Sequence, residues 1–201
     1  MVAETLRCFV ALDTPASLKA EVGNLIEQLR ISEGGDKAGW VKPDGVHITL
    51  KFLGNVTAAK VNEIKVALSE ALARPERATF DLSLGGLGQF GEPNAPRVIW
   101  LGINGNRSAL NQLQQSVEHT LNGLGFAPEE RGYNPHLTLA YVPALKPEEI
   151  IALNQLLTRF ATSPETYFAP FSLSEAVLMK SDRRADGIFY SSVEHFPLGP
   201  K

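Results

Sequence analysis

The chain has 201 residues, a formal net charge of −3 at pH 7, a pI near 5.8, 44% hydrophobic residues and 20% charged residues. This length provides a sizeable core for one domain or for two closely packed lobes. The negative charge argues against a protein that holds long nucleic acid on a broad basic surface. It still permits recognition of one phosphate or one strand end, which requires only local positive groups.

The single cysteine and the lack of long apolar segments predict a protein of the reducing cytoplasm. Cys8 is the only cysteine, which excludes an intramolecular disulfide, and its position in the apolar stretch RCFVAL predicts core packing. No apolar run approaches the roughly 20 residues of a membrane span, and the first ten residues lack the basic start and apolar centre of a signal peptide. We expect a soluble, cytoplasmic chain with no membrane partner. Monomer is the expected state, since nothing in the sequence requires an oligomer.

The first half of the chain predicts elements in the order β-α-β-α-β. Apolar residues recur every three or four positions in both helical segments, and each segment begins at a threonine that can cap it, Thr14 or Thr57. The strand segments are short apolar or alternating runs. The predicted ranges are strand 7–13, helix 14–30, strand 47–54, helix 57–73 and strand 78–84.

After a glycine-rich stretch at 85–96, the second half repeats this order and adds a final strand. A repeat of about ninety residues is too long for a solenoid and predicts an internal duplication. The expected fold is therefore a single α+β domain over 1–201, made of two pseudo-symmetric lobes at about 6–84 and 97–196. The predicted ranges are strand 97–103, helix 107–125, strand 136–142, helix 146–160, strand 171–181 and strand 188–196.

A histidine, an apolar residue, a threonine and a leucine open the second strand of each half, as HITL from His47 and HLTL from His136. Two lobes related by an approximate twofold axis bring these strands face to face across a central cleft. Alternate side chains of a strand share one face. The expected inward residues are His47, Thr49 and Lys51 in the first copy and His136, Thr138 and Ala140 in the second, with Phe52 and Tyr141 packed behind.

Two opposed imidazoles suit acid–base catalysis. Their unperturbed pKa is near 6.5, so near neutral pH one ring can act as a base while the other acts as an acid. Such a pair can take a proton from an attacking water or hydroxyl and give one to a leaving oxygen, as in-line displacement at phosphorus requires. The hydroxyls of Thr49 and Thr138 can donate hydrogen bonds to the non-bridging phosphate oxygens.

The same residues lack the pattern of a metal site. Neither motif has the His-x-x-x-His or clustered Cys/His spacing of a zinc site. Asp44 is a conceivable third ligand, but the PDG sequence that contains it is typical of a turn. The remaining histidines, His119 and His195, have no repeated pattern and are expected to be structural or surface residues. We expect neither a metal nor a cofactor.

The paired motifs resemble those of the 2H phosphoesterases, which are named for two His-x-Thr motifs. More closely, the chain is similar to the bacterial and archaeal RNA 2′,3′-cyclic phosphodiesterases, formerly called 2′-5′ RNA ligases. The resemblance covers nearly the whole chain, including RCFVALDTP, WVKPDGVHITLKFLG, NPHLTLAYV and FYSSVEHFPL. It implies a bilobal, internally duplicated α+β fold in which antiparallel sheets flank a central cleft and helices lie outside.

The resemblance also implies hydrolysis of a 2′,3′-cyclic phosphate at an RNA end to a 2′-phosphate. His47 and His136 match the catalytic histidines, and Thr49 and Thr138 match the phosphate-binding threonines. Because the 3′ oxygen leaves, the resemblance favours His47 as proton donor and His136 as proton acceptor, although a pseudo-symmetric site permits the reverse order. Some 2′-5′ RNA ligation would accompany a reversible reaction.

The chain departs from the family pattern after the second motif, where many relatives have an arginine following TLA and this chain has Tyr141. Strand alternation predicts that Tyr141 lies away from the cleft, so we expect the core chemistry to be retained. Cationic and aromatic side chains are the candidates for further contacts to RNA. The alternative for each is an ordinary role, as a solvated surface charge or as a packed aromatic ring. The candidates are Lys51, Arg131, Arg97, Trp40 and Phe90.

Two other functions use the same residues. The first is the same reaction on a small cyclic phosphate, such as a mononucleotide or an ADP-ribose derivative, and the absence of a basic track beside the cleft would favour it. The second is a non-catalytic RNA-binding module. The presence of both histidines with their threonines argues against this module, although a motif is only a hypothesis until the geometry is known.

Overall fold

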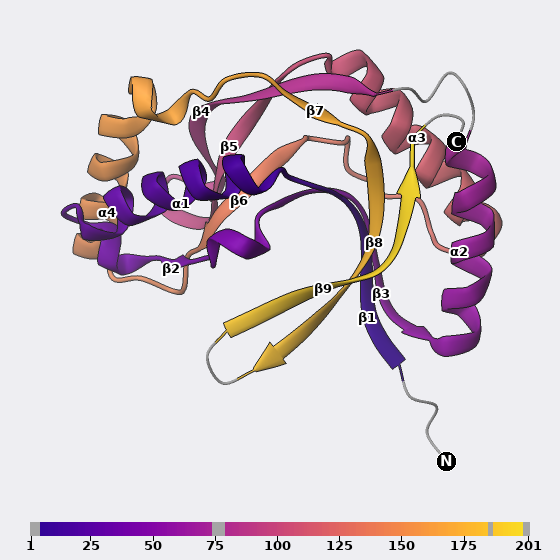
Figure 1. Cartoon of the computed structure of the whole chain (residues 1–201). Helices are drawn as coiled ribbons and strands as arrows, with labels where there is room; N and C mark the ends of the chain where they lie inside the picture. Colours follow the sequence, from indigo (N-terminus) through magenta and orange to yellow (C-terminus); the bar gives the residue numbers. More distant parts are fainter. Residues whose placement is uncertain (1–4, 74–78, 185–186, 199–201) are drawn as a thin grey trace.

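A computed structural model describes residues 5–73, 79–184 and 187–198. Within these ranges the strands form one curled antiparallel sheet, and four α-helices lie on its outer side (Figure 1). The α+β class is confirmed, whereas the expected separate sheets are replaced by one continuous sheet. The predicted strand 78–84 begins at Ala78, which lies outside the described residues.

The strands follow the order β7-β4-β5-β6-β3-β1-β8-β9 across the sheet, with β2 paired to β6. The neighbouring strands run antiparallel to one another. Their bounds are β1 Thr5–Asp13, β2 Gly39–Trp40, β3 His47–Thr57, β4 Phe80–Glu92, β5 Ala95–Gly105, β6 His136–Tyr141, β7 Phe171–Leu173, β8 Glu175–Arg184 and β9 Gly187–Pro197.

The third strand of each predicted half crosses to the other half of the sheet. β4 follows β1 and β3 in the chain but pairs with β5, and β8 follows β5 and β6 but pairs with β1. The halves of the sheet therefore do not coincide with the segments 6–84 and 97–196. Each half combines two strands of one copy with the third strand of the other, which joins the two copies through backbone hydrogen bonds.

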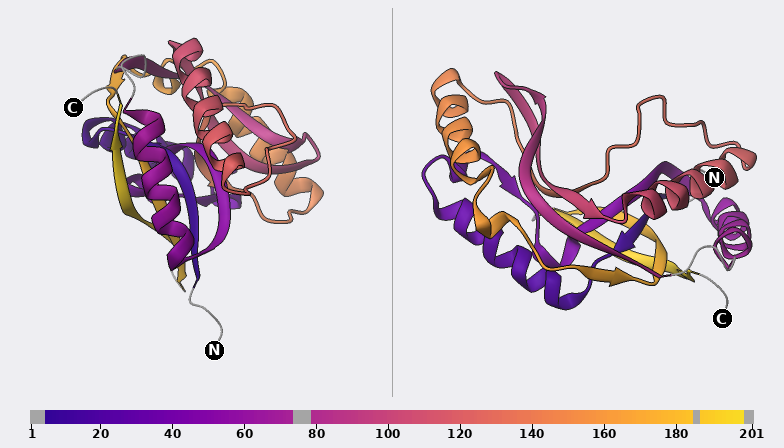
Figure 2. Two further views of the ribbon diagram at one scale, coloured as in Figure 1. Left: turned by 90° about the vertical axis from the view of Figure 1, so that its right-hand side faces the viewer. Right: turned by 90° about the horizontal axis from the view of Figure 1, so that it is seen from above.

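The helices α1 and α4 lie toward one end of the sheet, and α2 and α3 lie toward the other (Figures 1 and 2). Thr57 caps α2 as predicted, since its hydroxyl oxygen accepts a hydrogen bond from a backbone amide of the first turn. Thr14 does not cap α1, which begins after Pro15; its hydroxyl donates to the Val46 carbonyl oxygen at 3.2 Å. The bounds are α1 Ala16–Ile31, α2 Ala58–Leu72, α3 Arg107–Gly123 and α4 Pro147–Phe160, with short 3-10 turns η1 Gly35–Lys37, η2 Pro43–Gly45 and η4 Pro164–Thr166.

The main core lies between the sheet and the helices. Ile48, Leu50, Leu137 and Leu139 of the two motif strands are almost fully buried in it, and so is Cys8, which confirms the predicted core position of this cysteine. No helix within the described ranges is long and apolar enough to cross a bilayer. The opposite face of the sheet carries a smaller apolar cluster of Phe9, Ala11, Val177 and Met179, against which Tyr190 packs.

Candidate active site

The two motif strands meet at the centre of the sheet, where β3 and β6 pair through Ile48 and Leu137. Antiparallel pairing sets the residue before each of these opposite the residue after the other, so each histidine lies beside the threonine of the other motif. These side chains share the face opposite the buried Ile48 and Leu137. The site is therefore built on adjacent strands of one sheet, and it gathers His47 beside Thr138 and His136 beside Thr49.

A β-bulge after each threonine interrupts the side-chain alternation on which the sequence prediction rested. The pairing of β3 with β1 skips Leu50, and the pairing of β6 with β5 skips Leu139. A bulge inserts one unpaired residue, so side chains beyond it exchange faces relative to a regular strand. The same irregularity occurs at the same place in both copies of the motif.

This exchange corrects four predicted orientations. Lys51, expected on the cleft face, is 6% exposed and points to α3. Phe52 and Tyr141, expected behind the strands, are 67% and 45% exposed and line pockets on the cleft side. Ala140, the counterpart of Lys51, is fully buried.

Both histidine rings are held by a carbonyl oxygen two residues earlier. Nδ1 of His47 lies 2.7 Å from the Gly45 oxygen, and Nδ1 of His136 lies 2.8 Å from the Asn134 oxygen. A carbonyl oxygen only accepts hydrogen bonds, so these contacts assign a proton to Nδ1 in each ring. Nε2 is then the nitrogen that exchanges protons with a substrate, and its direction is fixed by the backbone before each strand.

Aromatic side chains pack against both rings. Phe9 and Tyr190 lie against His47, with ring centroids 4.7 Å and 4.9 Å from the imidazole. Phe90 lies edge-on to His136 at 4.7 Å. Phe90, a predicted substrate contact, therefore supports the second histidine.

Burial lowers the pKa of both histidines below the ordinary value for imidazole. In each ring the carbonyl contact at Nδ1 acts in the opposite direction. The Asp13 carboxylate also raises the pKa of His47, whereas positive charge on His136 and on Lys19, the ion-pair partner of Asp13, lowers it. Positive charge on His136 thus disfavours protonation of His47. When only one of the two rings is protonated, the site has one acid and one base.

Lys51 anchors the loop that leads from α3 to His136. Its Nζ lies 2.6 Å from Oε1 of Glu118 on α3 and 2.8 Å from the Ala127 carbonyl oxygen. The same Glu118 oxygen accepts a hydrogen bond from the Glu129 backbone amide at 2.8 Å. Lys51 therefore has a structural role; it also lines the pocket beside His136, and its contact with a substrate stays a prediction.

A pocket of about 680 Å³ lies beside His136. Arg97 and Arg131, whose contact with a substrate stays a prediction, line it, and within the described parts of the chain neither guanidinium forms an ion pair with a carboxylate. Tyr133 also lines the pocket, and its hydroxyl donates to the Thr49 carbonyl oxygen at 3.1 Å. This bond ties the loop before one histidine to the strand of the other.

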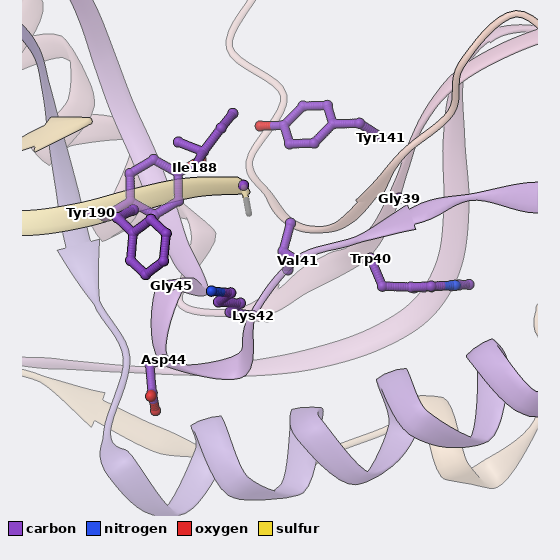
Figure 3. A pocket seen from close by; sticks show the side chains of 11 residues that line it. Gly39, Trp40, Val41, Lys42, Asp44, Gly45, Tyr141, Ile188 and Tyr190 are labelled. Atoms are coloured by element: carbon purple, nitrogen blue, oxygen red, sulfur yellow. The ribbon is translucent and has the colours of Figure 1, made fainter. Parts of the chain in front are cut away.

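A second pocket of about 360 Å³ lies on the side of His47 (Figure 3). Gly45, Tyr141 and Tyr190 line it. Trp40 also borders it, but its indole points away from the two tyrosines (Figure 3), and its Nε1 donates to the Gly35 carbonyl oxygen at 2.7 Å. The indole is therefore held against the protein, and the stacking of a base on Trp40 stays a prediction.

The sequence prediction missed Phe9, Tyr141 and Tyr190. A signal for Tyr141 was present, because it stands at the same spacing after His136 as Phe52 does after His47. Tyr190 has no comparable signal. It reaches the site through the pairing of β9 with β8 and of β8 with β1.

The other polar candidates lie apart from the paired motifs. His119 is exposed on α3, and Nδ1 of His195 lies 3.1 Å from Oε1 of Glu175 on β8. Asp44 lies in the η2 turn, as its PDG sequence predicted. Among the residues that the structure describes, no cluster of three or more histidine, cysteine or carboxylate side chains has the arrangement of a metal site.

Comparison with known proteins gives consistent results. A family described as the 2′-5′ RNA ligase superfamily matches residues 14–185. An RNA 2′,3′-cyclic phosphodiesterase of Methanothermobacter thermautotrophicus is 30% identical over 193 residues, which cover 96% of this chain and 99% of the relative. One from Methanocaldococcus jannaschii is 30% identical over 192 residues, covering 95% and 100%. The crystal structure of E. coli LigT complexed with 3′-AMP has a TM-score of 0.75 at 24% identity, covering 97% and 99%, and supports the fold.

We predict that Lys51→Met lowers the free energy of unfolding by about 3 kcal/mol, because it leaves a carboxylate that is largely buried without its partner. Urea unfolding monitored by circular dichroism measures this change. Lys60→Met is the matched control: it breaks the exposed Lys60–Glu63 pair and should cost less than about 1 kcal/mol. Equal effects of the two substitutions would contradict the anchoring role of Lys51.

Proposed function

Because the chain belongs to the 2′-5′ RNA ligase superfamily and, within it, to the RNA 2′,3′-cyclic phosphodiesterases, which are hydrolases, we propose that it hydrolyses the 2′,3′-cyclic phosphate end of an RNA to a 2′-phosphate. The observation that carries this proposal is the matched setting of His47 and His136. Each ring bonds a carbonyl oxygen through Nδ1 and stands beside a threonine of the other motif. This arrangement needs no metal for proton transfer.

In the proposed reaction, water attacks phosphorus opposite the 3′ oxygen. His136 accepts a proton from the water through Nε2 as the new P–O bond forms. His47 enters the step protonated on both nitrogens and gives the Nε2 proton to the 3′ oxygen as the P–O3′ bond breaks. The hydroxyls of Thr49 and Thr138 donate to the two non-bridging oxygens, where negative charge is greatest. The product is a 2′-phosphate with a free 3′-hydroxyl.

One electrostatic contribution supports this order of acid and base. Asp13 raises the pKa of His47, which favours the protonated ring that the acid requires, while burial and the positive charges of His136 and Lys19 lower that pKa. The pKa of His136 is set by burial and by its contact with the Asn134 oxygen, with no such contribution from a carboxylate among the described residues. If a 5′-hydroxyl replaces water as the attacking group, the same proton transfers give a 2′-5′ phosphodiester, which is the proposed ligase side reaction.

Two observations favour an RNA end over a small cyclic phosphate. Arg97 and Arg131 line the pocket beside His136, and Lys42 and Arg184 lie near the pocket beside His47. Positive groups therefore lie beyond the two motifs on both sides, although the chain as a whole is negative.

We predict that the protein converts a short RNA ending in a 2′,3′-cyclic phosphate into the 2′-phosphate product alone, with EDTA present. His47→Ala and His136→Ala should each lower kcat at least about 100-fold, the lower range for loss of a general acid or base. His119→Ala, an exposed histidine outside the site, serves as the control. Chromatography that separates 2′- from 3′-phosphates measures the result. Near-normal turnover in either site variant would rule out the two-histidine mechanism.

We also predict a bell-shaped dependence of kcat/KM on pH, with its maximum on the acid side of about pH 6.5, because both histidine pKa values are lowered. The rate rises with pH as the base, His136, loses its proton, and falls as the acid, His47, loses its own. Asp13→Asn lowers the pKa of His47 further, so the alkaline limb should move to lower pH while the acid limb stays.

The control for this experiment is Asp36→Asn, which removes an exposed carboxylate that does not act on His47. Its profile should match that of the unchanged protein. Movement of the acid limb in Asp13→Asn, with the alkaline limb unchanged, would show that the pKa of His47 lies below that of His136 and would contradict the order of pKa values assumed here.

A further inference from the structure

We propose that the pocket beside His47 (Figure 3) holds the terminal nucleoside of the RNA, with its base on the aromatic rings of Tyr141 and Tyr190 and the preceding phosphate at Lys42 and Arg184. This inference rests on the proposed function. It adds which part of the reaction, the nucleoside or the attacking water, lies on each side of the site.

The reaction geometry places the nucleoside on this side. In an in-line displacement the attacking water and the leaving 3′ oxygen lie on opposite sides of phosphorus. The ribose carries this leaving oxygen as well as the 2′ oxygen that stays bonded to phosphorus, so it lies on the side away from the water. If His47 protonates the leaving oxygen, the ribose and its base extend past His47. The water then enters from the side of His136, where Arg97 and Arg131 line the other pocket.

Two lining residues of the pocket, Tyr190 and Gly45, contact His47. The ring of Tyr190 lies against the imidazole, with centroids 4.9 Å apart and planes at 76°. Gly45, whose carbonyl oxygen holds His47 Nδ1, also lines the pocket. A Cβ at this glycine would lie 3.0 Å from the Tyr190 ring, so the absence of a side chain lets the ring sit close to the η2 turn.

The lining suits a flat aromatic group with polar edges. Tyr141 and Ile188, which are 45% and 36% exposed, both line this pocket, so their apolar surfaces are open to a bound group. In Figure 3 the Tyr141 side chain extends toward Ile188 and Tyr190. Single-stranded nucleic acid is bound in this way, by bases stacked on aromatic side chains. The volume of 360 Å³ lies within the usual range of about 300–1,000 Å³ for small-ligand sites.

Two cations are organised at the rim of the same pocket. The Lys42 Nζ lies 3.9 Å from the centroid of the Phe189 ring, and the Arg184 guanidinium carbon lies 4.3 Å from it. One aromatic ring therefore holds both positive groups beside the pocket. An RNA has a phosphodiester on the 5′ side of its terminal nucleoside, which a cyclic mononucleotide lacks. This phosphate is the group that the rim would contact.

The test uses dinucleotides that end in a 2′,3′-cyclic phosphate, either with a normal terminal base or with an abasic terminal ribose. The unchanged protein should show kcat/KM about tenfold higher on the normal substrate. Tyr141→Ala should remove this preference, chiefly by raising KM, and Tyr141→Leu should do the same because it keeps apolar area without an aromatic face. Tyr141→Phe should retain most of the preference.

Phe52→Ala is the matched control, because Phe52 occupies the equivalent position after the first motif but lines the other pocket. It should leave the ratio between normal and abasic substrates unchanged. Arg184→Gln should reduce the advantage of a dinucleotide over a nucleoside 2′,3′-cyclic phosphate by about three- to tenfold, and this reduction should shrink at high salt.

The outcomes separate this proposal from the one on which it rests. Hydrolysis of both dinucleotides at equal rates would overturn the base subsite and leave the phosphodiesterase function in place. A preference that is lost in Phe52→Ala but kept in Tyr141→Ala would assign the base to the pocket beside His136. If the unchanged protein hydrolysed no cyclic phosphate at all, both proposals would fail.

Discussion

The pairing of Ile48 with Leu137 is the contact on which the site depends. It joins the two halves of the sheet, and the two motifs are related by an approximate twofold axis through this pair. Since the apolar residue between each histidine and threonine points into the core, the polar side chains of both motifs must share the opposite face. The motif therefore combines packing with chemistry: its leucine and isoleucine positions fix the strands, and its histidine and threonine positions form the site.

The histidines also depend on the segments that precede their strands. Each carbonyl oxygen that holds Nδ1 belongs to a turn or loop fixed from elsewhere. The Thr14 hydroxyl ties the start of α1 to Val46 beside the first histidine, and the buried pair of Lys51 and Glu118 holds the loop that leads to the second. The lysine that anchors one histidine thus lies on the strand of the other. Such shared support explains why the two copies form one folding unit although each has its own helices.

Much of this arrangement was predictable from the sequence. The periodicity and strand patterns predicted the order of helices and strands, and the repeated motif predicted that His47, Thr49, His136 and Thr138 would come together. The strand exchange was not predictable, because the apolar pattern of β4 fits either neighbour and only tertiary pairing distinguishes β3 from β5. The bulges at Leu50 and Leu139 were also hidden, since a bulge leaves no residue type that marks it. They account for the wrong orientations of Lys51 and Tyr141.

The central claim is that His47 and His136 act together on one phosphate. The most direct measurement is NMR titration of the four histidine rings, with and without a nucleoside 2′-monophosphate. The account predicts that His47 and His136 titrate below the ordinary pKa in the free protein and that bound phosphate raises the pKa of both, while His119 and His195 do not respond. A response of only one of the two motif histidines would contradict a shared site.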